Sequence, residues 1–149
     1  MSLVPRAAFF RRILEALCAR PGYEWGGKSL AGMDCSGLPT WALYEASGHA
    51  IDLRRTHNTD MLWTSFPHVS EANAMAGDVA LYFGEGSKGP DDVSHAMVLV
   101  GFGLTAGMAW GGPKDTDPLK SRVAGKVIQV RDLRYRSDLA GFIRLPLTT

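Results

Sequence analysis

Residues 93–102 read VSHAMVLVGF, and this stretch is the one most typical of a buried β-strand. It is rich in β-branched and apolar residues, and turn-forming residues bound it on both sides. Side chains alternate between the two faces of a strand, so His95 shares a face with Met97 and Leu99. A histidine in so apolar a strand is either a core residue satisfied by one hydrogen bond or a functional group.

Shorter segments around this one also have the composition of strands. They are separated by turn residues and cover 78–83 (DVALYF), 108–110, 126–131 and 141–145. Consecutive strands joined by short turns pair in the antiparallel manner. The second half of the chain therefore predicts an antiparallel sheet of about five or six strands.

The first half of the chain has the period of helices instead. Three helices are expected, over 5–20, 35–47 and 58–66, the last with Asn58 or Thr59 as its N-cap. Cys18 falls on the apolar face of the first helix, where we interpret it as a small core residue. Helices followed by strands favour an α+β fold, with the N-terminal helices packed on the sheet.

Composition limits the classes of function. The chain has 149 residues and a net charge of +1, which suits one domain over residues 1–149 and excludes the strongly basic surface of a nucleic-acid-binding protein. No run of about 18 apolar residues predicts a membrane span. Arginines interrupt the N-terminal apolar stretch, so we expect synthesis in the cytoplasm without a signal peptide. We interpret a second group of arginines as a solvated surface: Arg131, Arg134 and Arg136.

Cys35 is the candidate nucleophile because it lies at the predicted start of the second helix. The free amides and the positive end of the helix dipole there favour an anion, so the thiol tends toward the thiolate. The same amides can hold the oxyanion that forms when a carbonyl is attacked. A buried structural cysteine is the alternative. With His95 as its base, Cys35 would support acyl transfer at neutral pH.

Metal and cofactor sites are not expected. The remaining histidines are His49, His57 and His68. None of them forms a CxxC or HxxxH pair that would turn Cys35 and His95 into a zinc site, so we predict no metal. Gly101-Phe102-Gly103 lacks the third glycine and the following helix of a dinucleotide site. We therefore predict no cofactor.

Four blocks of this sequence, in their order and spacing, resemble the NlpC-type cell-wall cysteine endopeptidases. They are YEWGG at 23–27, MDCSGL at 33–38, GDV at 77–79 and SHAMVLVG at 94–101, and the resemblance extends from Tyr23 to about Gly112. The Asp-Cys-Ser-Gly-Leu block is the most specific. The resemblance implies a papain-like α+β fold, related to that of CHAP amidases. It also implies hydrolysis of amide bonds in peptidoglycan stem peptides through an acyl-enzyme.

The resemblance also assigns roles to particular residues. Cys35 would be the nucleophile and His95 the base. Tyr23 would place its hydroxyl near the oxyanion. Asp34 and Ser36 would border the substrate site, where relatives recognise the free amine of the stem peptide.

The third catalytic position departs from the family pattern. Relatives orient the histidine with a His, Asn or Gln on the strand that follows the histidine strand, and here that segment reads AGMAWGG at 106–112. With a turn centred at 103–104, Trp110 and Gly112 lie opposite His95 and are the candidates for this position. Neither side chain can accept a hydrogen bond. A backbone carbonyl, Asp115 and Asp117 are the alternatives.

The biological setting is open at the level of sequence. A catalytic domain without wall-binding repeats suits a phage tail or lysis component, a delivered effector or a piece of a larger protein. We expect action at the cell wall or periplasm after delivery or lysis, with a phage-tail, secretion or immunity partner. One alternative is a catalytically inactive relative that binds peptidoglycan or serves in phage tail assembly. Another is a CHAP-type amidase or a lipid acyltransferase, which would need an exposed apolar patch such as 61–66.

Overall fold

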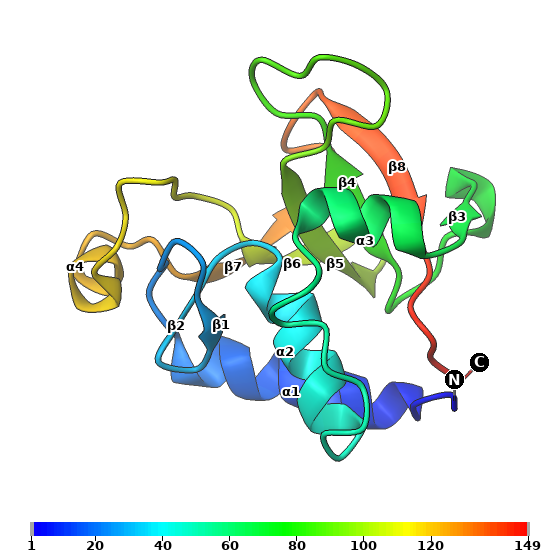
Figure 1. Ribbon diagram of the computed structural model, residues 1–149, viewed down its shortest axis with the longest axis horizontal. Helices are drawn as coiled ribbons and strands as arrows, with labels where there is room; N and C mark the ends of the chain where they lie inside the picture. The colour runs from blue at the N-terminus through cyan, green and yellow to red at the C-terminus, as the bar shows by residue number, and fades with distance from the viewer. Residues whose placement is uncertain (1, 149) are drawn as a thin grey trace.

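The computed structural model describes residues 2–148 and has an α+β fold, as predicted (Figure 1). The helices are α1 (Arg6–Ala19), α2 (Gly37–Ala46), α3 (Thr59–Ser65) and α4 (Pro118–Val123), with a 3-10 turn η1 at Glu71–Asn73. The strands are β1 (Lys28–Ser29), β2 (Gly32–Met33), β3 (His68–Val69), β4 (Val79–Tyr82), β5 (His95–Gly101), β6 (Leu104–Met108), β7 (Ile128–Asp132) and β8 (Leu139–Ile143). None of the helices described has the length and apolar character that crossing a membrane requires.

Six of these strands form one antiparallel sheet in the order β3-β8-β4-β5-β6-β7. The predicted strand at 93–102 becomes β5, which lies between β4 and β6. Tyr82 pairs with His95 and Val79 with Val98 in the β4–β5 register. The strands β1 and β2 form a separate two-stranded hairpin. The prediction of about five or six antiparallel strands is confirmed.

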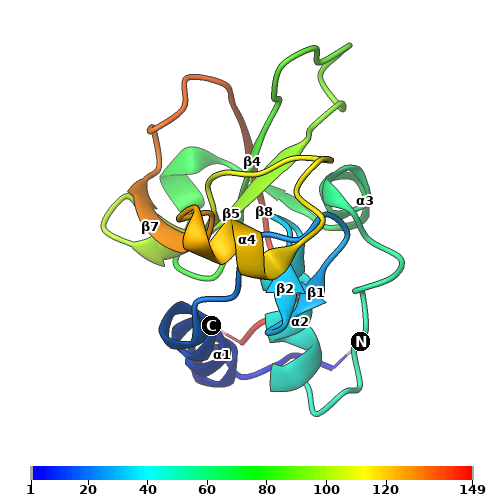
Figure 2. The ribbon, with the colours of Figure 1, turned by 90° about the vertical axis from the view of Figure 1, so that its left-hand side faces the viewer.

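Helices α1 and α2 pack together on one side of the sheet (Figures 1 and 2). Helix α2 is buried over its first seven residues because its sequence is apolar almost all round. Its Leu38 and Leu43 belong to one core cluster with Val98 and Ile143 of the sheet. A smaller cluster, which includes Tyr82 and Met97 and contacts Tyr135, is formed by the alternate residues of the strands.

The interpretation of Cys18 as a core residue is wrong. The buried face of α1 consists of Phe9, Ile13 and Ala16, whereas Cys18 is exposed. Leu14 lies four residues before Cys18 on the same flank and is 60% exposed. The core-facing stripe is therefore narrower than the sequence pattern suggested.

The β5–β6 turn is tighter than expected. Phe102 has a φ of 56° at its tip, and the flanking Gly101 and Gly103 also adopt positive φ, which glycine tolerates without steric cost. Strand β6 consequently begins at Leu104, four residues before the predicted strand at 108–110. Val98 pairs with Ala106, and this register continued to the start of β5 brings Ala109 opposite His95.

The two ends of the described chain are joined by backbone hydrogen bonds. Val4 N–H donates to the Pro146 carbonyl at 2.8 Å, and Thr148 N–H donates to the Val4 carbonyl at 2.8 Å. Arg6 reinforces this clasp by donating from Nε to the Thr148 carbonyl at 2.9 Å. The segments before α1 and after β8 are therefore held side by side.

Candidate active site

An open cleft of about 1570 Å³ contains all seven site residues expected from the sequence. It is bordered by the loop before α2, the start of β5 and the segments that follow β6 and β7. The expected residues in its lining are Tyr23, Asp34, Cys35, Ser36, His95, Trp110 and Gly112. The fold thus brings together residues that are up to 89 positions apart in the chain.

Cys35 is held by the turn that begins α2. The Asp34 carboxylate accepts a hydrogen bond from Gly37 N–H at 2.8 Å and so caps the start of the helix. The sulfur of Cys35 lies 3.7 Å from the carbonyl oxygen of Ser94, the residue that precedes His95. The candidate nucleophile therefore reaches the strand that carries the candidate base.

The thiolate expected at Cys35 is not the resting form. Burial and the negative charge of Asp34 raise the pKa of the thiol to about 11, against smaller opposing effects of backbone N–H groups and of Lys28. Helix α2 begins only at Gly37, two residues after Cys35. At neutral pH the free protein therefore holds a neutral thiol.

His95 is the first residue of β5 and is only 7% exposed. Its Nε2 lies 2.6 Å from the hydroxyl oxygen of Tyr135, and its ring centroid lies 5.4 Å from that of Tyr82. Burial and the positive charge of Arg136 lower the pKa of His95 to about 4. The imidazole is therefore neutral at neutral pH and is able to accept a proton.

The prediction that Trp110 or Gly112 contacts His95 is wrong, because Tyr135 takes that place. Trp110 is 57% exposed, and Gly112 donates its N–H to Asp115 at 2.9 Å. The tight β5–β6 turn moves both residues beyond the position opposite His95. The two acidic alternatives are also engaged elsewhere, Asp115 with Lys126 and Asp117 as the N-cap of α4.

Tyr135 follows β7 and is separated from His95 by 40 residues, so no local pattern links the two. The neighbouring Arg136 makes two hydrogen bonds to Asp138, at 2.9 and 2.7 Å. Its positive charge also opposes the rise that burial causes in the pKa of Tyr135. Asp138 in turn accepts a hydrogen bond from Gly84 N–H at 2.9 Å. Arg136 is thus a half-buried part of the site and not the solvated surface residue that its sequence context indicated.

Lys28 is a site residue that sequence reasoning missed. Its Nζ lies 2.6 Å from Asp34 Oδ1 and 2.6 Å from Ser36 Oγ. The side chains of Lys28 and Asp34 are only 17% and 14% exposed. The carboxylate expected to meet a substrate amine already has an ammonium partner within the chain.

Tyr23 also lines the cleft. It is 4% exposed, and burial together with the nearby Cys35 raises the pKa of its hydroxyl, which stays protonated. Gly111 packs directly on the Tyr23 ring, where any side chain at position 111 would overlap the ring. This glycine lets the segment after β6 lie close over the tyrosine.

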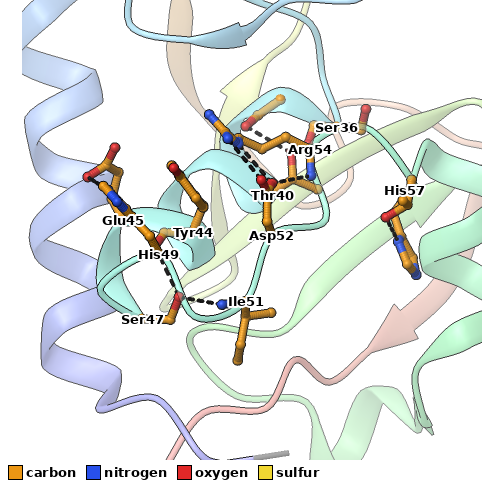
Figure 3. Close-up of polar contacts among 12 residues, drawn as sticks. Ser36, Thr40, Tyr44, Glu45, Ser47, His49, Ile51, Asp52, Arg54 and His57 are labelled. Carbon is orange, nitrogen blue, oxygen red and sulfur yellow. Dashed lines mark hydrogen bonds and ion pairs between the residues drawn. The ribbon is translucent and has the colours of Figure 1, made fainter.

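The loop between α2 and α3 forms a further wall of the cleft. Arg54 makes hydrogen bonds to Asp52 at 2.8 and 2.9 Å (Figure 3), and its guanidinium lies 3.5 Å from the centre of the Tyr44 ring. His49 stacks on the same ring at 4.2 Å. These contacts fix the loop on the exposed side of α2.

The alternatives to a peptidase site concern metal ligands and the apolar segment 61–66. Within residues 2–148, no three His, Cys, Asp or Glu side chains are grouped as a metal site requires. The segment 61–66 exposes Met61, whereas Leu62 and Trp63 are buried, so it does not form a broad apolar patch.

Comparison with known proteins agrees with this geometry. Residues 20–136 match the model of the NlpC/P60 family. A probable endopeptidase of Mycobacterium tuberculosis is 32% identical over 94 residues, which cover 62% of this chain and 21% of that protein. The chain thus spans about a fifth of the length of the curated relatives it matches.

Solved structures share the fold at lower identity. The NlpC/P60 domain of the peptidoglycan hydrolase SagA has a TM-score of 0.64 at 21% identity, with 95% of this chain and 100% of that chain covered. The peptidoglycan hydrolase RipB from Mycobacterium tuberculosis has a TM-score of 0.62 at 23% identity, with 98% of this chain and 70% of that chain covered. These structures show the shared fold. The family match over residues 20–136, which includes Cys35, His95 and Tyr135, establishes that the chain belongs to the NlpC/P60 family.

Proposed function

We propose that this chain is a cysteine endopeptidase or amidase that hydrolyses amide bonds in peptidoglycan stem peptides. The observation that carries the proposal is the arrangement at the cleft: the Cys35 thiol reaches the strand of a buried, neutral His95 whose Nε2 is bonded to Tyr135. With Nε2 engaged, Nδ1 is the ring nitrogen available to the thiol. The site of action would be the cell wall or periplasm, where such peptides occur.

The first half of the reaction starts from the neutral pair. As the sulfur of Cys35 attacks the amide carbon, His95 takes the thiol proton, a carbon–sulfur bond forms and the carbonyl oxygen becomes an oxyanion. The backbone amides that precede α2 and the protonated hydroxyl of Tyr23 are the donors available to that oxyanion. The thiol of Cys35 and the imidazole of His95 are both uncharged in the free protein, so the proton is transferred only as the sulfur attacks.

The second half returns the enzyme to its starting state. His95 gives its proton to the leaving nitrogen as the carbon–nitrogen bond breaks, which leaves a thioester on Cys35. His95 then takes a proton from water, whose oxygen attacks the thioester, and returns that proton to the departing sulfur.

Tyr135 would act as a positioning residue for the base. Its oxygen can accept the Nε2–H of His95, and its ring packs edge-on against the buried Tyr82 ring at 5.9 Å. An acceptor at Nε2 keeps the imidazole in the tautomer whose Nδ1 is free. The inactive alternative rested on the lack of a third group, and Tyr135 removes that reason.

The proposal is tested by digestion of purified peptidoglycan with wild type, Cys35→Ala and Cys18→Ala, read by mass spectrometry. Cys18 is the matched control because it is the other free cysteine and lies on the exposed flank of α1. New fragments with wild type and Cys18→Ala, and none with a folded Cys35→Ala, are expected. The same fragments from Cys35→Ala, or none from wild type with several stem-peptide chemistries, would contradict the proposal.

A further inference from the structure

Four donors within the chain already engage the Asp34 carboxylate next to Cys35. Oδ1 accepts hydrogen bonds from Gly37 N–H at 2.8 Å, Lys28 Nζ at 2.6 Å and Ser36 Oγ at 3.1 Å. Oδ2 accepts from Gly26 N–H at 3.2 Å. Each carboxylate oxygen offers about two lone-pair directions, so Oδ1 is fully used and Oδ2 keeps one free. The positive charge of Lys28 beside the carboxylate is therefore what opposes a substrate amine.

Lys28 is held in this place by the backbone and is not a freely moving surface side chain. It begins β1, and it pairs with Met33 of β2, the residue that directly precedes Asp34. The short β1–β2 hairpin thereby carries the ammonium to the carboxylate. The low exposure of both side chains makes the pair less screened than a surface salt bridge.

The pair also sets the charge that an incoming peptide meets. Lys28 neutralises Asp34, and two of its three N–H donors are used by Asp34 and Ser36. Lys28 lines the cleft together with Cys35. A substrate ammonium brought there would have to displace a bound ammonium of like charge, whereas an amide carbonyl could accept from Lys28 without displacing it.

We propose that Lys28 closes the Asp34–Ser36 subsite to amines, so that this chain cleaves stem peptides whose amino end is acylated and not those with a free amino terminus. The proposal rests on the peptidase function proposed above. In peptidoglycan, an acylated amino end means a stem peptide that is still joined to its glycan strand. Lys28 would then be the residue that sets this specificity.

The test compares two forms of one stem tetrapeptide, with an N-acetylated and with a free amino end. We expect wild type to give a higher kcat/KM on the acetylated peptide. Lys28→Met leaves Asp34 unpaired, and it should shift the ratio of the two kcat/KM values toward the free amine by about tenfold or more, as for loss of one charge-assisted pair. The ratio is the readout because loss of Lys28 also raises the pKa of Cys35 and slows both substrates.

Controls separate specificity from folding and from catalysis. Lys120→Met removes an exposed lysine on α4 and should leave the ratio unchanged. Lys28→Gln keeps hydrogen-bonding capacity without the charge, and Asp34→Asn added to Lys28→Met should cancel the shift. Thermal unfolding identifies any variant that does not fold.

Binding of both peptides to Cys35→Ala, with and without Lys28→Met, gives the same comparison without turnover. If wild type cuts neither peptide while Lys28→Met still shifts the ratio of the two dissociation constants toward the free amine, that outcome would contradict the peptidase function and support the role of Lys28 in binding. A wild-type preference for the free amine, an unchanged ratio in Lys28→Met, or no binding of either peptide would overturn the proposal.

Discussion

The two reactive residues lie on walls of the cleft that are built in opposite ways. The helix wall, residues 26–37, holds Cys35 through hydrogen bonds between residues two to eight positions apart. The sheet wall consists of His95 and residues 135–138. Its hydrogen bonds join residues far apart in the chain, with 40 positions between His95 and Tyr135 and 54 between Gly84 and Asp138. Local contacts of the kind found in the helix wall appear in the sequence as a short motif. Contacts that depend on the order of strands in a sheet leave almost no motif.

The two walls are nevertheless alike in their electrostatics. Each places one ion pair beside its reactive group, Lys28–Asp34 beside Cys35 and Arg136–Asp138 beside His95. In each pair the member with the larger effect opposes ionisation: Asp34 disfavours the thiolate, and Arg136 disfavours the imidazolium. The free protein is thus held as a neutral thiol at Cys35 and a neutral imidazole at His95.

The largest expected effect comes from removal of the base of the sheet wall. His95→Gln should lower kcat/KM by about 10³-fold, within the range usual for loss of a general base. The rate of fragment release measures it, with the exposed His49→Gln as control. A decrease in kcat/KM of less than tenfold would contradict the role of His95 as the base, because Cys35 would then react without it.

The next effect concerns the pH dependence of stability. The pKa of His95 is about 4 in the folded protein and about 6.5 in an unfolded chain. Between these values the unfolded state binds the extra proton, so the free energy of unfolding falls as pH is lowered from about 6.5 to 4. The loss has an upper limit of about 3 kcal/mol and is complete below pH 4.

Chemical denaturation across this pH range, with wild type and His95→Gln, measures the contribution of His95. The variant should lose less stability over the same window because it has no imidazole to protonate. Equal pH dependence in the two proteins would show that His95 is not held neutral by burial.

A smaller effect is expected from the positioning residue. Tyr135→Phe removes one hydrogen bond to His95, worth about 1–1.5 kcal/mol, so kcat should fall by about tenfold while KM stays close to its original value. Tyr44→Phe is the matched control, because Tyr44 lies on α2 and stacks with His49, a histidine other than the candidate base. An unchanged kcat, or a change in KM alone, would show that the sheet wall does not depend on Tyr135.

The sequence was informative where the chemistry is local. The helical period of residues 35–47 correctly predicted a helix that begins near Cys35. The position of His95 in an apolar strand singled it out as either a core residue or a functional group. Lys28 was not predicted as a site residue, because a lysine in a glycine-rich loop usually lies in solvent. Only the pairing of β1 with β2 brings it to Asp34.

The errors on the sheet wall come from geometry that no short pattern encodes. Three successive positive φ values at Gly101–Gly103 shorten the β5–β6 turn. In the resulting register, Trp110 and Gly112 no longer lie opposite His95. Tyr135 reaches His95 only because the chain turns back after β7. Short strands such as β3 were likewise missed, since two residues carry no periodicity.

The clasp between Val4 and Leu147 makes the path of this chain close to a ring. A linker of a few residues from Thr148 back to Val4 would close that ring, and the fully exposed Phe102 offers a place to open it. The resulting circular permutant would read β6, Tyr135, Cys35 and finally His95 along its sequence, with the same cleft. The order of the cleft residues along the chain is therefore set by the position at which the ring is opened.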